Sequence, residues 1–245
     1  MSGEESGAKA PSASVRAVIF DLFHTLIDVN NAPGSSTSQI LGIDPIEWNR
    51  RLAEEARHHA LGEERDPLES IRRIVNSMGR SVDEDQLRAA VRCRPNRFRH
   101  ALRNVRADIL EGLRELRAMG LRLGVLSNAG LDEVDAWDDS PLAPLIDCPL
   151  FSCHEGLMKP DPAFYLRAAR RLGVSPARVI FAGDGGSSEH AGARRAGMIT
   201  VLMLGLLEES LPELAAQRER NTDYTARSMA ELVAIVRNLA APAAG

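Results

Sequence analysis

Two aspartates stand where a carboxylate could do chemistry. Asp21 directly follows the apolar run 15–20 (VRAVIF), and Asp184 directly follows 177–183 (ARVIFAG). Either could be only a helix cap or an Asx turn, but a carboxylate held rigidly at the end of a buried strand can also act as a covalent nucleophile or a metal ligand. Two carboxylates at adjacent strand ends repel each other unless a cation or protons lie between them. A site with few carboxylates that keeps water and accepts phosphate suits Mg2+, so the pair predicts a magnesium site.

Three further polar residues could bind an anion. Ser127 and Asn128 follow another apolar run and, with backbone N–H groups nearby, could hold phosphoryl oxygens, although such a Ser is often only a helix cap. Lys159 lies in the turn Lys-Pro-Asp-Pro, and it and Lys9 are the only lysines among the 30 Lys and Arg residues. Because Lys and Arg are not interchangeable at a site, this choice indicates a compact cation that offsets the charge of Asp21 and of a bound anion.

Short apolar runs separated by helical stretches supply the elements that would position these residues. Strands are expected at 15–20, 121–126, 177–183 and 200–204, with helices at 108–120, 162–173, 189–197 and 228–239. Strands that alternate with helices predict βαβ units and a parallel sheet. Open α/β sheets bind ligands at the carboxyl ends of their strands, so we expect the polar residues to gather at that edge.

Helical stretches replace strands between Asn30 and Arg106. They cover about 45–61, 67–78 and 83–104, and residues 30–38 (NNAPGSSTS) supply a hinge of small and turn-forming residues. We predict a helical cap over residues 35–105, inserted into an α/β core of residues 15–34 and 106–245, after a disordered leader at 1–14. Residues 86–107 contain seven Arg and no Asp or Glu, which fits either a solvated helix face or a basic wall over an anionic substrate.

The composition limits the class of protein. The chain has 245 residues, of which 44% are hydrophobic and 26% charged, as in a globular protein, and its net charge of −4 argues against non-specific binding to nucleic acid. The apolar runs are much shorter than the ~20 residues that cross a bilayer, and the polar start has no apolar signal sequence. The three cysteines have no zinc-site spacing. We therefore expect a cytoplasmic protein with neither nucleic-acid nor membrane partners, which acts on a small anionic substrate.

Taken in order, four motifs resemble those of the haloacid dehalogenase (HAD) superfamily of hydrolases, in its type with a helical C1 cap. The resemblance extends from about Val15 to the C-terminus. The first motif, Asp-x-Asp-x-Thr, is matched by Asp21 and Thr25, and the second, a Ser at a strand end, by Ser127. The third motif is a Lys, matched by Lys159. The fourth, Gly-Asp followed by a further acid, is matched by Gly183-Asp184 and Glu189. The resemblance implies a three-layer, Rossmann-like parallel sheet core with an inserted helical cap.

The resemblance also implies a hydrolase that works in two steps. Asp21 attacks the electrophile to give an aspartyl ester or aspartyl phosphate, which water then hydrolyses. In the phosphatases of this family Mg2+ is held by residues that correspond to the Asp21 carboxylate, the Phe23 backbone carbonyl and Asp184. The expected activity is therefore that of a Mg2+-dependent phosphatase for a small organic phosphate.

The remaining motif residues acquire roles by the same resemblance. The implied catalytic residues are Asp21, Thr25, Ser127 and Lys159. Those expected to bind phosphate are Ser127, Asn128, Lys159 and His24. Glu189 is expected behind them, where it would hold the waters of the metal or orient Lys159.

Two positions depart from the family pattern. Phe23 replaces the second Asp, which in family phosphatases protonates the leaving alkoxide and then activates water. An aromatic residue there is similar to the family's 2-haloacid dehalogenases, whose halide needs no proton but which work without a metal and lack Gly-Asp at the fourth motif. Two alternatives to a phosphatase therefore stay open: a 2-haloacid dehalogenase, and a catalytically weak HAD-like protein that binds phosphate.

His24 stands where the family usually has Gly; it either tolerates a positive φ or supplies part of the missing acid–base function.

Overall fold

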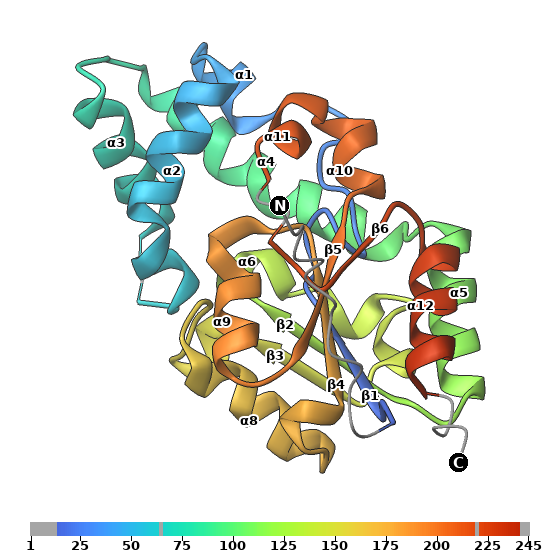
Figure 1. Cartoon of the computed structure of the whole chain (residues 1–245). Coiled ribbons are helices and arrows are strands. Elements are labelled where there is room, and N and C mark those ends of the chain that lie inside the picture. The colour runs from blue at the N-terminus through green and yellow to red at the C-terminus, as the bar shows by residue number, and fades with distance from the viewer. Residues whose placement is uncertain (1–13, 64–65, 219–220, 241–245) are drawn as a thin grey trace, which may run out of the picture.

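A six-stranded parallel sheet forms the centre of the molecule in the computed structural model, which describes residues 14–63, 66–218 and 221–240 (Figure 1). The strand order is β3-β2-β1-β4-β5-β6. The strands are β1 (Ala17–Phe20), β2 (Arg122–Ser127), β3 (Cys148–Phe151), β4 (Val179–Gly183), β5 (Ile199–Met203) and β6 (Tyr224–Ala226). The central strand β1 is buried along its whole length, so the apolar run that precedes Asp21 is a strand covered on both faces, as predicted.

The four predicted strands are confirmed, and the sheet has two more. The additional strands, β3 and β6, are the two edges of the sheet. An edge strand can contain proline because one side of it needs no ladder hydrogen bond, and β3 contains Pro149. Only three residues form β6. Neither segment therefore has the continuous apolar run by which the four inner strands are recognised.

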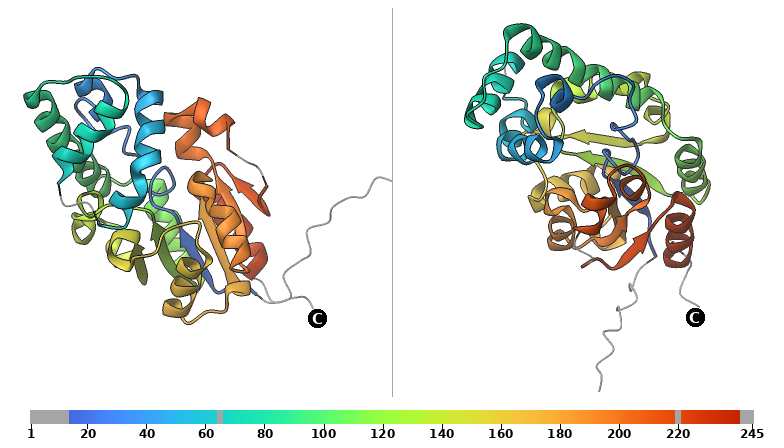
Figure 2. Two further views of the ribbon diagram at one scale, coloured as in Figure 1. Left: turned by 90° about the vertical axis from the view of Figure 1, so that its left-hand side faces the viewer. Right: turned by 90° about the horizontal axis from the view of Figure 1, so that it is seen from above.

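Helices cover both faces of the sheet, which confirms the three-layer α/β class. On one face lie α5 (Ala107–Ala118) and α12 (Met229–Ala240), and on the other α8 (Pro162–Leu172) and α9 (Glu189–Arg195) (Figures 1 and 2). Each pair contributes to its own apolar cluster against the sheet. The shorter helical elements are α6 (Leu131–Val134), α7 (Ser152–Glu155), α10 (Gly205–Ser210), α11 (Pro212–Ala216), and the 3-10 turns Trp137–Asp139, Ala143–Leu145, Pro176–Arg178 and Gly186–Ser188.

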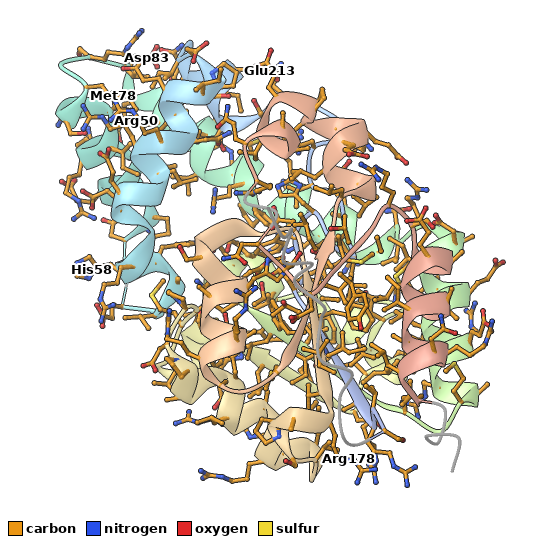
Figure 3. All side chains as sticks on the ribbon, viewed as in Figure 1. Arg50, His58, Met78, Asp83, Arg178 and Glu213 are labelled. Carbon is orange, nitrogen blue, oxygen red and sulfur yellow. The ribbon has the colours of Figure 1, made fainter. Side chains whose placement is uncertain are left out.

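Four helices between β1 and α5 form a group that we call the helical unit (Thr37–Arg103). They are α1 (Thr37–Leu41), α2 (Pro45–Ala60), α3 (Pro67–Ser77) and α4 (Glu84–Arg103). An aspartate caps the start of each of the three longer helices, and proline follows it in α2 and α3, which is a common helix start. The unit has an apolar cluster of its own around Trp48, while charged residues such as Arg50 and Asp83 lie on its surface (Figure 3).

The segment rich in arginine joins the helical unit to the sheet domain. On α4, Arg94, Arg99 and Arg103 form ion pairs with Glu133, Asp135 and Asp139, all in or beside α6. Arg97 donates to four carbonyls of the segment that leads from β1 to α1, those of Val29, Asn30, Ala32 and Gly34. Arg94 and Arg97 are thus engaged inside the protein. Arg99 and Arg103 pair with acids at the surface, where their side chains are 38% and 53% exposed, as expected of a solvated helix face.

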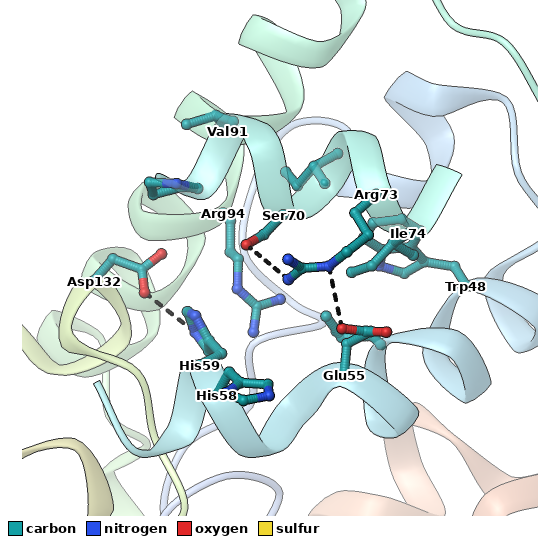
Figure 4. A pocket seen from close by; sticks show the side chains of 13 residues that line it. Trp48, Glu55, His58, His59, Ser70, Arg73, Ile74, Val91, Arg94 and Asp132 are labelled. Carbon is teal, nitrogen blue, oxygen red and sulfur yellow. Dashed lines mark hydrogen bonds and ion pairs between the residues drawn. The ribbon is translucent and has the colours of Figure 1, made fainter. Parts of the chain in front are cut away.

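The innermost of these ion pairs lies beside a small cavity. Glu133 is 4% exposed, pairs with Arg94 and accepts a hydrogen bond of 2.8 Å from the Gly130 N–H. The His59 imidazole lies 3.3 Å from Asp132 and 3.6 Å from Glu133, beside a cavity of about 40 Å³ that Trp48 and Ile74 also line (Figure 4). Burial alone would raise the pKa of Glu133, but Arg94 and His59 outweigh it and hold the pKa at about 2.

Glu133→Gln should destabilise the protein at neutral pH. The substitution keeps the size of the side chain but removes the charge that Arg94 and His59 face, so we expect the free energy of unfolding to fall by about 2 kcal/mol at pH 7. Because the pKa is lowered in the folded state, the stabilisation is complete above the ordinary value of 4.5 and is lost as the pH falls toward 2. Urea unfolding of both proteins between pH 7 and about pH 3 measures the difference.

Glu54→Gln on α2 provides the matched control. Glu54 pairs with Arg50 and Arg51, but its side chain is 49% exposed, and exposed ion pairs contribute little to stability. This variant should unfold like the wild type throughout the pH range. A Glu133→Gln deficit that persisted unchanged at pH 3 would show that its charge is not what stabilises the contact between α4 and α6.

Candidate functional site

Three of the predicted residues lie at the same edge of the sheet. Asp21 continues β1 and its backbone N–H donates to the Ala182 carbonyl at 2.9 Å, while Ser127 ends the neighbouring strand β2. Asp184 follows β4, the strand on the other side of β1. All three side chains are buried. The parallel register therefore brings together residues that are far apart in the sequence, as the strand pattern predicted.

Lys159 links two of the acidic side chains. Its Nζ donates to Asp21 Oδ1 at 2.5 Å and to Glu189 Oε2 at 2.6 Å, and the residue is 3% exposed. Burial works against the ammonium ion, but Asp21 and Glu189 outweigh it and hold the pKa of Lys159 above its ordinary value. The only lysine among the described residues is thus a permanently charged bridge between two carboxylates.

Asn128 fixes the backbone of Lys159. Its side-chain oxygen accepts from the Lys159 N–H at 2.7 Å, and its Nδ2 donates to the Lys159 carbonyl at 3.0 Å. Sequence reasoning assigned Asn128 to phosphate binding and did not foresee this contact, which spans 31 residues. The geometry makes Asn128 a residue that positions Lys159.

Gly183 leaves the space that Glu189 occupies. Glu189 begins α9, is fully buried, and accepts from the Gly185 N–H at 2.8 Å through Oε1. A Cβ added at Gly183 would lie 2.2 Å from that oxygen, which no side chain could tolerate without displacing Glu189. The fourth motif therefore needs glycine at position 183 for packing, because only the missing side chain lets Glu189 reach Lys159.

Arg218 pairs with Asp184 and was not among the predicted site residues. Its Nη2 donates to Asp184 Oδ2 at 2.5 Å, while Oδ1 accepts from the Gly186 N–H at 3.0 Å. Arg218 follows α11 and lies 34 residues from its partner. The segment around it has no recognisable motif, so nothing in the sequence singles it out.

The acidic cluster of Asp21, Asp184 and Glu189 is dense. One oxygen from each carboxylate lies within 4.8 Å of the others. Burial, reinforced by Asp184, raises the pKa of Asp21, and burial, reinforced by Asp21 and Asp184, raises that of Glu189; Lys159 opposes both shifts. Three carboxylates thus face two cations, Lys159 and Arg218, and a further positive charge would be stabilised there.

The donor set of this cluster fits Mg2+. Asp21 and Asp184 offer hard, anionic oxygens close to one another, which is the type of ligand that Mg2+ prefers. The family resemblance leads us to expect the Phe23 backbone carbonyl, two residues after Asp21, as a third oxygen. Both Glu189 oxygens accept hydrogen bonds, from Lys159 and from the Gly185 N–H.

Two buried polar atoms have no hydrogen-bond partner among the described residues of this region. They are Ser127 Oγ and His24 Nδ1. Since a buried polar group without a partner is costly, the Ser127 hydroxyl, at the end of β2 beside Asp21, is suited to donate to an oxygen of a bound anion. His24 has φ +58°, which confirms that histidine is tolerated where the backbone is left-handed. Thr25 Oγ1 lies 3.4 Å from Asp21 Oδ2 and donates to it.

Phe23 contacts the helical unit. Its ring meets that of Phe98 on α4 edge to face, with 5.0 Å between the centroids, and the Arg94 guanidinium lies 5.2 Å from the Phe98 ring centre. The position that carries the second acid in the family pattern is therefore filled by an aromatic pair. No proton can come from this side chain.

Comparisons with known proteins identify the family of the chain. A family model described as a haloacid dehalogenase-like hydrolase matches residues 15–197. Proteins named glyceraldehyde 3-phosphate phosphatase, from Methanocaldococcus jannaschii and Methanopyrus kandleri, are each 32% identical to the chain, over 53% and 54% of its length. These matches cover 55% and 57% of the two relatives, so the chain spans about half the length of each.

Solved structures share the fold. The L-2-haloacid dehalogenase from Xanthobacter autotrophicus superimposes with a TM-score of 0.66 at 20% identity, covering 92% of this chain and 99% of that one. A HAD phosphatase from Thermococcus onnurineus gives 0.56 at 23% identity, with 91% and 98% covered. At these identities the likeness establishes the architecture and leaves the chemistry to the residues of the site.

Lys159 and Glu189 should be strongly coupled in a double-mutant cycle. Lys159→Met leaves Asp21 and Glu189 buried without their cation, so we expect a loss of about 3 kcal/mol in unfolding free energy. Glu189→Gln removes one of the two carboxylates, and the double variant should therefore lose about 2 kcal/mol less than the sum of the single losses. Denaturant unfolding of the four proteins measures the coupling.

The exposed pair Arg50 and Glu54, which lie 2.9 Å apart, is the control for this cycle. Arg50→Met and Glu54→Gln should show no measurable coupling. Simple additivity of the Lys159 and Glu189 variants would contradict the bridging role.

Proposed function

We propose that this chain, which belongs to the haloacid dehalogenase-like hydrolases, is a Mg2+-dependent phosphatase for a small organic phosphate. The observation that carries the proposal is the pairing of Asp184 with Asp21 in one buried cluster of carboxylate oxygens. A second carboxylate beside the nucleophile favours a metal ion and a phosphoryl group, whereas it would oppose a reaction that proceeds without a cation. The two relatives named as phosphatases support the same class.

In the proposed reaction Asp21 is the nucleophile. One of its carboxylate oxygens attacks phosphorus, the bond from phosphorus to the leaving oxygen breaks, and an aspartyl phosphate forms. Water then attacks phosphorus, which releases inorganic phosphate and restores the carboxylate. Thr25, which donates to Asp21 Oδ2, orients the attacking group.

The remaining polar residues hold the phosphoryl group. Ser127 and His24, whose buried atoms lack partners, donate to its oxygens, and Lys159 balances its charge together with that of Asp21. Asn128 and Glu189 position Lys159. Mg2+, held by Asp21, Asp184 and the Phe23 carbonyl, would neutralise the phosphoryl oxygens and fix their orientation.

The helical unit is proposed to act as the cap that selects the substrate. The edge-to-face contact between Phe98 on α4 and Phe23 brings this unit to the loop that carries Asp21. Residues 35–105 would form the cap and residues 15–34 and 106–245 the core, while the proposed leader falls almost entirely outside the described residues.

A 2-haloacid dehalogenase is the second candidate, favoured by Phe23. A halide leaves as an anion, so carbon–halogen cleavage would need no acid at this position. The ion pair between Asp184 and Arg218 also favours this candidate, since Arg218 could neutralise Asp184 without a metal. The third possibility is a phosphate-binding protein with little turnover.

Parallel assays of phosphate and halide release distinguish these candidates. With a panel of phosphomonoesters and 2-haloacids, in Mg2+ and in EDTA, we expect phosphate alone and only with Mg2+. Asp21→Asn should lower the rate at least about 10³-fold, because it removes the nucleophile. Asp85→Asn, which changes an exposed carboxylate on α4, should leave it unchanged. Halide release in EDTA would identify a dehalogenase, and phosphate release by Asp21→Asn would exclude the proposed nucleophile.

Phe23 should make turnover depend on the leaving group. Since this side chain donates no proton, rates for a series of aryl and alkyl phosphates should fall steeply as the pKa of the leaving alcohol rises. Phe23→Asp should flatten that dependence and raise the rate on alkyl phosphates by about 10²-fold, the lower end of what general acid catalysis contributes.

Phe23→Leu is the control in this series, because it changes the packing against Phe98 but supplies no acid. It should keep the steep dependence. If the wild type already shows the shallow dependence of Phe23→Asp, another group donates the proton and the assignment is wrong.

A further inference from the structure

We infer that Arg218 competes with the divalent cation for Asp184, so that Mg2+ binds by displacing its guanidinium. The inference rests on the proposed metal site and adds a residue to it. Arg218 Nη2 lies 2.5 Å from Asp184 Oδ2, and Asp184 is 4% exposed. The contact is therefore a buried ion pair at a proposed metal ligand, made by a side chain outside all four sequence motifs.

Arg218 is the cation that balances Asp184. Lys159 is already shared between Asp21 and Glu189. Asp184 receives a backbone hydrogen bond from Gly186, and within the described ranges its ion-pair partner is Arg218. Removal of Arg218 would leave three buried carboxylates with one lysine, and a divalent cation would be the strongest available replacement.

Both oxygens of Asp184 already accept hydrogen bonds. Oδ1 takes the Gly186 N–H and Oδ2 the Arg218 guanidinium. A metal ion bound directly to Oδ2 would share that oxygen with a second positive charge, and the two cations would repel each other in a region with little water to screen them. Occupation of the oxygen by one cation therefore disfavours the other.

The Arg218 side chain is free to leave, unlike that of Lys159. It is 19% exposed, and in the part of the chain that the structure describes its guanidinium has one partner, Asp184, while its Nε has none. It lies over the turn at Gly185 and Gly186, where an added Cβ would approach it to 3.5 and 3.4 Å. Exchange thus costs one ion pair and disturbs no other hydrogen bond of the guanidinium.

The direct test is Mg2+ binding to the full chain without substrate. In isothermal titration with MgCl2 we expect Arg218→Gln to bind Mg2+ about tenfold more tightly than the wild type, a difference of about 1.4 kcal/mol. Without Mg2+ its melting temperature should be lower, because Asp184 has lost its counter-ion. Added Mg2+ should raise that temperature more in Arg218→Gln than in the wild type.

Two variants separate charge from packing. Arg218→Lys keeps a cation and should bind Mg2+ with about the wild-type affinity. Arg227→Gln breaks an ion pair with Glu208 whose arginine is 54% exposed, and it should change neither Mg2+ affinity nor the response of the melting temperature.

Three outcomes would overturn the inference. Equal Mg2+ affinity of Arg218→Gln and the wild type would show that the two cations do not compete, while the proposed phosphatase would stand. Weaker binding by Arg218→Gln would make Arg218 a residue that orients Asp184 for the metal. Absence of Mg2+ binding in every variant would exclude the metal site itself, and the competition with it.

Discussion

Crowding of three carboxylates at one edge of the sheet is the constraint on which the rest of the site depends. Asp21, Asp184 and Glu189 are all buried, and their oxygens approach within 4.8 Å. Such a group is stable only if cations are held among its members. Lys159 supplies one of these cations. Asn128 holds the backbone of Lys159, and the missing Cβ of Gly183 leaves room for Glu189, so that Lys159 and Glu189 come into contact. The site is thus a network of three carboxylates and two cations, Lys159 and Arg218, in which the motif residues depend on one another for position.

The same balance supplies the chemistry of the proposed reaction. A carboxylate attacks only when ionised, and burial raises the pKa of Asp21; positive charge beside it keeps the nucleophile usable. A phosphoryl group brings additional negative charge, which a divalent cation and Lys159 together would offset. Phe23 contributes neither a charge nor a proton to the proposed reaction. In the proposed reaction the electrostatic groups that the family resemblance implies are present, whereas an aromatic contact with α4 occupies the position of the acid.

The inner strands and the four motifs could be predicted from the sequence because each is a local signal. An apolar run that ends in Asp marks both β1 and β4, and a lysine in an arginine-rich chain marks Lys159. Edge strand β3, with Pro149, has no such signal. Contacts between distant segments were equally hidden: Arg218 meets Asp184 across 34 residues, and Arg99 meets Asp135 across 36. Seven arginines in one segment indicated a charge requirement, but only the fold shows that three of them find their acidic partners in and around α6.

Covalent trapping tests the central claim that Asp21 becomes phosphorylated. Aspartyl phosphate is an acyl phosphate, which borohydride reduces to homoserine, so enzyme quenched during turnover with a phosphomonoester can be reduced, digested and sequenced by mass spectrometry. The account predicts homoserine at position 21, dependent on substrate and Mg2+. Turnover with an unmodified Asp21, or with the modification at another carboxylate such as Asp184, would contradict it.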